Sequence, residues 1–444
     1  MSKFGNKLLW GETVTYEPAK ILTPVDVNSL SKIIASCEKC RVVGSRHSFS
    51  PLIVTNYTQI DLKYLTGLVS DDREEVTFWA GSTVEEVLIY LTQTDRTLHG
   101  VGSIHSQTLG GALSTSLVGV FTTSFSSHVT KVVTLNAEGE EIVWNEPYFI
   151  RNSMGMLGVI IKVSIQTFPN KATTHKHEKM KIDDIISFWK HADFISSDSS
   201  FSVHDIRENK KVDVVHNYIS NAMFETQYPH YWDVNQYLIY ELFTAPLSWV
   251  FNVVLDDVKF WAINPLDRET ALLGIDREQY GFTYTDYIVP LTNCSNALTE
   301  VAEVDGFNPL IRMKYMKEPN SSCFDPTQVP SCRLELYESH AKNNIYSTLQ
   351  SVQDIMLAHG GFVHWGKIYL GNITDQMKRY KCYNTFKNIR KVQDPTGKFL
   401  NDYLEGKKTY YNEYGARKWV TIAYVLCVIV FIVPVLYFKL KILI

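Results

Sequence analysis

The chain has 444 residues, of which 45% are hydrophobic and 20% are charged, and its formal net charge is −4. This composition is that of a globular protein with a substantial core, and the length suits two domains and a tail. The small acidic charge gives no reason to expect nucleic acid as a partner, because nucleic-acid-binding domains carry clustered positive charge.

Residues 1–170 alternate helical and strand patterns, which indicates an α+β domain. Thr83 and Glu86 have the spacing of a capping box, so a helix should start there. Runs rich in β-branched residues indicate strands. The predicted elements are helices over 27–37 and 83–91 and strands over 41–43, 76–80, 131–135 and 159–167.

Residues 171–385 contain more aromatic residues and form a second predicted domain. A helical pattern over 344–359 ends at Gly360, a residue typical of helix C-termini. Strands are predicted over 286–290, 333–337 and 362–369. We expect residues 386–404, which include a turn-rich part, to return to the first domain, and residues 405–418 to form a polar linker.

The last predicted element, 419–438, is a run of 20 residues without a charge. As a helix it would measure about 30 Å, the thickness of the bilayer core. A buried core helix is the alternative, but the run is apolar on every face. We predict a single transmembrane anchor in the endoplasmic reticulum or mitochondrial outer membrane. Only six residues follow it, and no signal peptide precedes residue 30, so the rest of the chain is expected in the cytosol.

The seven cysteines are sparse and odd in number, which predicts a poor disulfide framework. Cys37 and Cys40 form a CxxC pair, but no second pair or histidine pair accompanies it, so we assign no metal site. Asn-x-Ser/Thr triplets matter only if the domain enters a secretory lumen. They begin at Asn56, Asn293, Asn320 and Asn372.

Two loops rich in glycine and hydroxyl residues stand about 55 residues apart, at 43–51 and 100–112. Successive backbone N–H groups in such a loop can surround an anion, and glycine lets the ligand come close. Either loop alone is equally well explained as an ordinary turn. Together they indicate one extended, phosphate-bearing ligand held between them.

The order of these pieces resembles the vanillyl-alcohol-oxidase-type flavoproteins, and within them the sugar-1,4-lactone and alditol oxidases. The resemblance covers roughly residues 8–405. Its most specific parts are His364-Trp365-Gly366-Lys367, which resembles the family's HWGK signature, and the closing segment 394–403. Further matching pieces are Trp10-Gly11, the two glycine-rich loops, 155–160 and 286–290.

The resemblance implies a two-subdomain, PCMH-type FAD-binding domain over 1–170 and an α+β substrate (cap) domain over 171–385. It implies FAD as cofactor, attached covalently through His47. The cofactor-binding positions that it implies are Val43, Gly44, Ser45, Arg46, His47, Ser48, Gly102, Ser103, Thr108, Gly111, Thr115, Val159 and Ile160.

The resemblance also implies catalytic roles for Lys367, Arg312 and His364, and substrate contacts for Ser103, Arg312 and Lys367. A fixed lysine near the flavin N1 edge stabilises the negative charge of the reduced ring. On an extended segment Trp365 and Lys367 would share a face and His364 would point the other way. Gly102 matches a small residue that leaves room for oxygen, which favours an oxidase.

The sequence departs from the family pattern at three places. Arg46 stands where the family usually has glycine, and its side chain would either crowd the pyrophosphate or pair with it. Residues 114–119 replace a GTHG-like turn, and Leu310 replaces an acid two residues before Arg312. Glu335 is a possible substitute for that acid, but a solvated strand face is the favoured interpretation.

We therefore expect an FAD-dependent oxidoreductase that oxidises an aldono-1,4-lactone with O₂ and yields H₂O₂ and an ascorbate-like product. Its expected partners are a small sugar-derived substrate, O₂ and a lipid bilayer. Two alternatives stay open: an alditol or sugar-alcohol oxidase on the same scaffold, and a catalytically decayed flavin-binding membrane protein.

Overall fold

The computed structural model describes residues 7–8, 14–102, 104–119, 122–191, 196–223, 282–307, 309–317, 321–339 and 345–408. These residues all belong to one compact unit. Ser103, Cys427, most of the predicted linker and the predicted anchor at 419–438 lie outside the described residues. Within the described residues, no helix combines the length and the apolar character needed to cross a bilayer.

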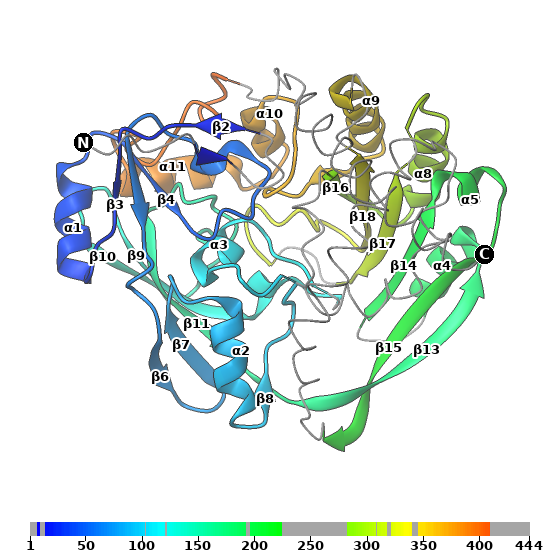
Figure 1. Cartoon of the computed structure of the whole chain (residues 1–444), viewed down its shortest axis with the longest axis horizontal. Coiled ribbons are helices and arrows are strands. Elements are labelled where there is room, and N and C mark those ends of the chain that lie inside the picture. Colours follow the sequence, from blue (N-terminus) through cyan, green and yellow to red (C-terminus); the bar gives the residue numbers. More distant parts are fainter. Residues whose placement is uncertain are drawn as a thin grey trace, which may run out of the picture. The chain divides into compact units, whose positions relative to one another are not determined.

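The first lobe contains a parallel three-stranded sheet with the order β3 (Lys20–Leu22), β5 (Thr58–Asp61), β4 (Cys40–Val43). Helix α1 (Val27–Ser36) begins with a capping box between Asp26 and Ser29 and buries its apolar side in the same core. The predicted helix over 27–37 and the short strand before Gly44 are thus confirmed (Figure 1).

An antiparallel five-stranded sheet follows with the order β10-β9-β11-β7-β6. Its middle strand, β11, separates two cores. Ile161 packs in the core beneath α1, while Val163 and Ile165 pack in the main core on the opposite side of the sheet. Because both faces of β11 are buried, most of its residues are apolar. The strands are β6 (Leu68–Asp71), β7 (Glu75–Trp79), β9 (Val129–Leu135), β10 (Glu141–Trp144) and β11 (Val159–Gln166).

Helix α2 (Val84–Thr92) starts with the predicted capping box between Thr83 and Glu86. Helix α3 (Leu109–Ser114) begins within the second glycine-rich segment, so residues 109–112 of the predicted loop are helical. The remaining short elements of this part are β1 (Lys7–Leu8), β2 (Thr15–Tyr16), β8 (Arg96–Thr97), β12 (Phe168–Pro169) and the 3₁₀ turns η2 (Pro51–Ile53) and η3 (Phe125–His128).

A seven-stranded antiparallel sheet carries the second half of the described fold, with the order β13-β15-β14-β17-β18-β16-β19. Its strands are β13 (Lys171–Met180), β14 (Ser196–Ser202), β15 (Val212–Met223), β16 (Phe282–Pro290), β17 (Leu310–Met316), β18 (Ser331–Ser339) and β19 (Phe362–Val363).

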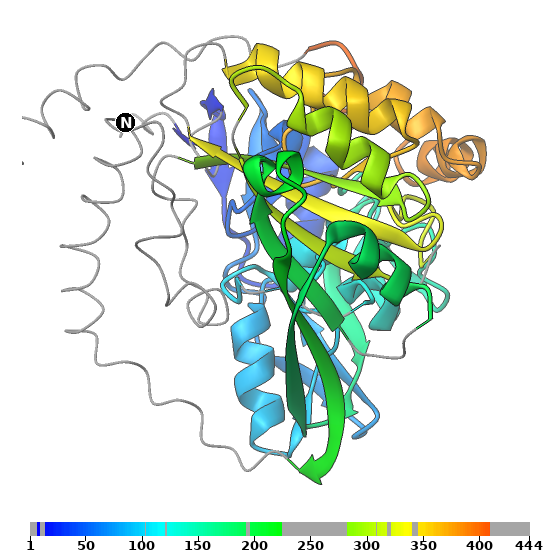
Figure 2. The same cartoon turned by 90° about the vertical axis from the view of Figure 1, so that its right-hand side faces the viewer.

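One face of this sheet is apolar and the other is charged, because side chains alternate along a strand. Ile311, Met313, Leu334 and Leu336 pack into the main core with the covering helices (Figure 2). Their neighbours in sequence point to the opposite face. The helices are α4 (Ile182–Trp189), α5 (Val203–Arg207), α8 (Cys294–Ala302) and α9 (Ile345–Ala358).

After α10 (Ile373–Lys378) and α11 (Tyr383–Gln393), the chain returns to the first lobe. The N–H of Cys40 donates to the carbonyl of Lys398 at 3.0 Å, and the Asn401 amide donates to the carbonyl of Val54 at 2.8 Å. Phe399 packs in the core beneath α1. Strand β4 therefore depends on residues more than three hundred positions away.

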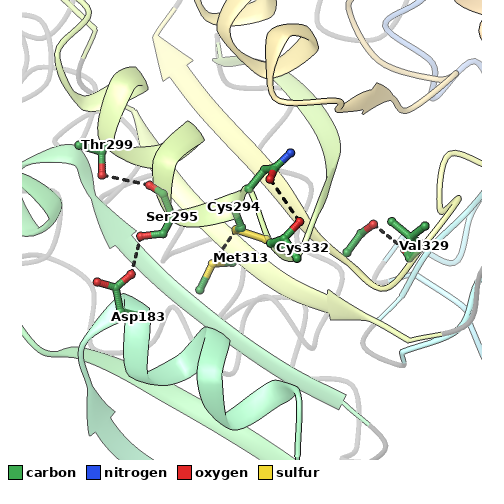
Figure 3. Close-up of a disulfide and its surroundings, with 10 residues drawn as sticks. Asp183, Cys294, Ser295, Thr299, Met313, Val329 and Cys332 are labelled. Carbon is green, nitrogen blue, oxygen red and sulfur yellow. Dashed lines mark hydrogen bonds between the residues drawn. A yellow bond between two sulfur atoms is a disulfide. The ribbon is translucent and has the colours of Figure 1, made fainter.

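The expectation of a poor disulfide framework is wrong. Cys294 at the start of α8 is bonded to Cys332 on β18 (Figure 3). Cys323 is bonded to Cys382. The partners stand 38 and 59 residues apart and meet only after the sheet and helices pack, so their spacing carried no signal. Cys37 and Cys40 are both buried and free.

Candidate active site

A cavity of about 520 Å³ lies between the glycine-rich loops of the first lobe and the charged face of the seven-stranded sheet. Its volume is in the range of pockets that bind cofactors and small ligands. The first lobe contributes the 43–48 and 102–115 loops and residues 154–160. The opposite wall comes from β17, β18 and the 364–367 segment.

The two glycine-rich loops contact each other at one edge of the cavity. Ser45 Oγ donates to the carbonyl of Ser106 at 2.5 Å, and Ser106 Oγ lies 2.8 Å from His47 Nε2. A Cβ on Gly44 would stand 2.2 Å from Thr108 Oγ1, so this approach requires glycine. The loops therefore form one continuous backbone-rich wall.

Most predicted cofactor-binding residues line this cavity. The side chain of Val159 does not: it is buried in the core of the first lobe, between the lining residues Gly158 and Ile160, so the assignment of Val159 stays a prediction. Ser103 lies outside the described residues. The residues that do line it are Val43, Gly44, Ser45, Arg46, His47, Ser48, Gly102, Thr108, Gly111, Thr115 and Ile160.

The 364–367 segment is a turn and not the predicted strand, since β19 ends at Val363. The N–H of Lys367 donates to the carbonyl of His364 at 3.0 Å, which closes the turn. His364 and Lys367 consequently both line the cavity, while Trp365 is buried and its Nε1 donates to the carbonyl of Phe324 at 2.7 Å. The expectation that Trp365 and Lys367 share a face is therefore wrong, because a turn lacks the alternation of a strand.

His364 is held in one orientation inside this turn. The N–H of Gly366 donates to His364 Nδ1 at 3.1 Å, so Nδ1 acts as the acceptor and the proton belongs on Nε2. Burial lowers the pKa of His364 to about 4. The ring is therefore neutral at pH 7.

Lys367 lies close to the first glycine-rich loop. Its Nζ is 4.9 Å from the centroid of the Phe49 ring, and the N–H of Phe49 donates to the carbonyl of Gly366 at 2.9 Å. Burial, and then the charge of Lys367, lower the pKa of His47 to about 4. The structure thus brings His47 and Lys367 together from opposite ends of the chain, with the histidine neutral.

The charged sheet face carries a network of buried ion pairs. Arg333 binds both oxygens of Asp286, with Nη2 at 2.5 Å from Oδ2, and Lys314 Nζ lies 2.9 Å from Glu335 Oε1. Arg333 Nη2 is also 3.3 Å from Glu335 Oε1. Burial alone would raise the pKa of Glu335, but Lys314, Arg333 and Arg312 hold it well below its usual range.

Glu335 therefore does not lie on a solvated strand face, and the favoured interpretation of its position is wrong. Its exposed fraction is 4%, and it lines the cavity beside Arg312. Lys314 and Arg333 were missed altogether. A period-two pattern of charges on otherwise apolar strands (Arg312 and Lys314, Arg333 and Glu335) was the signal that could have found them.

The shape and chemistry of the cavity fit FAD. A dinucleotide needs an extended space, with close backbone approach at its pyrophosphate and fixed polar groups at its ring. The lining of the cavity includes Arg41 and Phe399 as well as Lys367 and Glu335. Glycines form much of its wall: Gly44, Gly81, Gly102, Gly110, Gly111, Gly155 and Gly158.

Comparisons with known proteins agree with this fit. Residues 18–144 match the FAD binding domain family, and residues 326–407 match the D-arabinono-1,4-lactone oxidase family. The chain is 23% identical to L-gulonolactone oxidase of Mus musculus over 90% of this chain and 97% of that protein. The chain thus contains an FAD-binding segment and a segment similar to sugar-1,4-lactone oxidases, and its relatives over nearly the whole length are named as sugar-lactone oxidoreductases.

Other relatives extend this picture. L-gulono-1,4-lactone dehydrogenase of Mycobacterium tuberculosis is 24% identical over 89% of this chain and 97% of that protein. The solved structure of cholesterol oxidase from Brevibacterium sterolicum superimposes with a TM-score of 0.66 at 12% identity, covering 90% of this chain and 96% of that one. At that identity the likeness shows the shared FAD-binding fold alone.

Two of the departures from the family pattern coincide with an unusual backbone conformation. Arg46 adopts a φ of 66°, a left-handed conformation that favours glycine, and its Nη2 lies 3.5 Å from Gln59 Oε1. Ser116, in the turn that replaces the GTHG-like motif, has a φ of 62°. This sequence therefore places side-chain-bearing residues at two positions whose left-handed conformation glycine adopts more readily.

The third departure is Leu310, which is half-buried and stands on the same face of β17 as Arg312. Its partner across the sheet is Tyr337 on β18. An apolar side chain cannot accept hydrogen bonds from substrate hydroxyls. The acid that this face retains is Glu335, one strand away.

Proposed function

We propose that this protein oxidises an aldono-1,4-lactone of the gulono-, galactono- or arabinono- type, with O₂ as acceptor and H₂O₂ as by-product. The observation that carries the proposal is the placement of Lys367 beside His47, facing a sheet wall that holds Arg312. FAD, when bound, supplies the acceptor for the hydride. The names of the family and of the full-length relatives support a lactone as substrate.

Each residue has a role that follows from its position. Lys367, buried next to the first loop, provides a fixed positive charge where negative charge develops. Arg312 offers a planar set of donors for substrate hydroxyl oxygens. His364 positions the turn through its Nδ1, and its neutral Nε2–H is a donor inside the cavity wall.

We further propose that FAD is attached covalently through His47. A neutral imidazole is the form that can bond through a ring nitrogen, and the lowered pKa of His47 keeps it neutral. Ser106 fixes the ring through Nε2. After acid precipitation the flavin should stay with the polypeptide, and His47→Ala should release it. Recovery of all FAD in the acid supernatant of the wild-type protein would disprove the attachment.

A substrate panel with peroxide detection tests the activity. The purified protein should be yellow, bleach with a sugar lactone and recover its colour in air. Bleaching by alditols but not by lactones would favour the sugar-alcohol oxidase. A protein that stays oxidised with every substrate, although it holds FAD, would favour the catalytically decayed alternative, for which Leu310 is the supporting observation.

We also propose that residues 419–438 anchor the protein in a membrane. Deleting everything after Lys418 should give a protein that no longer sediments with membranes and keeps its flavin. The expected cytosolic position of the catalytic domain stays a prediction. The two disulfides favour an oxidising lumen instead, because disulfides are rare in the cytosol. Asn56 is exposed and starts a glycosylation triplet, so a shift in mobility on glycosidase treatment, lost in Asn56→Gln, would place the domain in the lumen.

A further inference from the structure

We infer that Glu335 determines substrate specificity by accepting hydrogen bonds from substrate hydroxyls, in place of the acid missing at position 310. This inference rests on the proposed function, since it concerns the same cavity. Glu335 stands directly across from Arg312 in the register of β17 and β18. Residues paired in this way have Cβ atoms about 5 Å apart, so one polyol can reach both side chains.

The charge state of Glu335 suits an acceptor. Lys314 Nζ at 2.9 Å and Arg333 Nη2 at 3.3 Å keep the carboxylate ionised inside a buried wall. An ionised carboxylate is purely an acceptor, with about four lone-pair positions on its two oxygens. Lys314 and Arg333 both approach Oε1, whereas Oε2 accepts from the Tyr337 hydroxyl at 2.8 Å. Oε2 therefore retains acceptor capacity for a ligand in the cavity.

The neighbouring strands fix this carboxylate in place. Asp286 on β16 pairs with Glu335 on β18, and Arg333 bridges the two acids. Arg333 Nη1 also donates to the carbonyl of Val118, from the loop on the cofactor side of the cavity, at 2.9 Å. A hydrogen-bonding group that is held by its neighbours discriminates well, because a substrate lacking the matching hydroxyl leaves it unpaired.

Moving the acid from position 310 to position 335 changes which arrangement of substrate hydroxyls the site can recognise. An acid at position 310 would lie two residues along β17 from Arg312, whereas Glu335 lies beside it on the next strand. The paired donor and acceptor are thus arranged across the strands and not along one strand. A substrate whose adjacent hydroxyls can reach Arg312 and Glu335 at the same time is therefore favoured over its epimer.

The test compares steady-state kinetics of the full-length protein with Glu335→Gln. The substrates are the sugar lactone that the wild type oxidises fastest and its monodeoxy analogues. We expect Glu335→Gln to raise KM for the parent lactone roughly ten-fold while kcat changes less. With the analogue lacking the contacted hydroxyl, wild type and variant should have similar KM values.

Glu335→Gln leaves the buried Lys314 without its carboxylate, so a loss of stability must be separated from a loss of recognition. The variant Glu335→Gln with Lys314→Met removes both charges, and Tyr337→Phe alters only the hydroxyl on Oε2. Glu303→Gln, at the exposed C-terminal end of α8, is the matched control and should behave as wild type. Flavin absorbance reports that each variant retains its cofactor.

Restoring an acid sharpens the test. Leu310→Glu in the Glu335→Gln background should recover part of the lost affinity and change which epimer is preferred. Equal KM increases for the parent lactone and all deoxy analogues would overturn the inference and assign Glu335 a structural role. Unchanged KM values in every variant would overturn it as well. A wild type without activity on any lactone would refute the proposed function itself.

Discussion

The two walls of the cavity bind in different ways. The wall from the first lobe is made mainly of backbone, with glycines at Gly44, Gly110 and Gly111 and hydroxyls at Ser45 and Thr108. The wall from the seven-stranded sheet is made of long charged side chains held in ion pairs. A backbone wall recognises a group common to all dinucleotides, whereas a side-chain wall can change its ligand through single substitutions. The proposed function thus assigns cofactor and substrate recognition to separate parts of the chain.

The largest loss of stability is expected from a substitution on the sheet wall. Arg333→Met should leave Asp286 buried and unpaired and lower the free energy of unfolding by about 4 kcal/mol. Chemical denaturation of the flavin-loaded protein measures it. Combining Arg333→Met with Asp286→Leu should recover most of the loss, because an apolar pair replaces a buried ion pair at little cost. No recovery in the double variant would mean that the pair is not the cause.

The backbone wall should be destabilised by substitutions that add side-chain volume, because it contains few charged side chains to remove. A Cβ on Gly119 would stand 1.6 Å from the carbonyl oxygen of Val101, so Gly119→Ala must displace the backbone. We expect a loss of about 3 kcal/mol and weaker flavin retention, measured by thermal unfolding and absorbance. Gly110→Ala is the control for the unfolding measurement, since its Cβ would make ordinary contacts at 3.4 Å with Ala80. Because Gly110 itself lines the cavity, flavin retention is compared between Gly119→Ala and the wild type. Equal effects of the two substitutions would contradict the close approach at Gly119.

A third test uses pH at the junction of the two walls. The pKa of His364 is lowered to about 4 from an ordinary value near 6.5, so the unfolded state binds the proton more strongly. Stability from this group is present above pH 6.5 and is lost as pH falls toward 4. The loss should be about 3 kcal/mol at most. His364→Gln should reduce the pH dependence of the unfolding free energy between pH 6.5 and 4 by the share of this one group, while His47, whose pKa is lowered in the same way, retains its own share. An unchanged slope would contradict the prediction.

A substitution of Arg46 is expected to raise the stability of the protein by a smaller amount. Its φ of 66° costs a side-chain-bearing residue about 1 kcal/mol compared with glycine. Arg46→Gly should therefore raise the unfolding free energy by up to that amount without loss of flavin. Arg46→Ala keeps the strain and removes the guanidinium, so it separates the two contributions. Loss of flavin in both variants would show that the guanidinium contacts the cofactor.

The smallest effect is expected at Gly102. An added Cβ would stand 2.9 Å from Leu117 Cδ1, the end of a flexible side chain, so the fold should tolerate alanine. Gly102→Ala should slow reoxidation of the reduced flavin by O₂ a few-fold, about 1 kcal/mol in barrier, and slow reduction less. Stopped-flow reduction and reoxidation give both rates. Equal reoxidation rates in the two proteins would remove the argument for an oxygen path at this position.

The sequence predicted the backbone wall better than the side-chain wall for a physical reason. Small-residue loops and capping residues are local signals, so the loops at 43–51 and 100–112 and the capping box at Thr83 could be read directly. The ion pairs join strands that are distant in sequence, and only the register places Glu335 opposite Arg312. For the same reason the disulfide partners could not be predicted.

The 364–367 segment shows how one local assumption misplaces a residue. A strand was predicted over 362–369, and the alternation of side chains along a strand then placed His364 on the opposite face from Lys367. Gly366 instead permits a tight turn that packs on the first loop, with Ser48 and His364 within 3.5 Å of a Cβ at that position. The motif was recognised correctly, but its geometry depends on a contact with residues more than three hundred positions earlier.

The return of residues 394–404 to the first lobe has a consequence for biogenesis. Cys40, Arg41 and the loop before β5 are bonded to Lys398, Phe399 and Asn401, so the lobe that opens the chain is completed by nearly its last described residues. Folding of this lobe cannot finish as it leaves the ribosome, because such distant contacts form only once the chain is almost complete. Shortened products ending before residue 394 should therefore fail to acquire flavin and be degraded as incomplete chains.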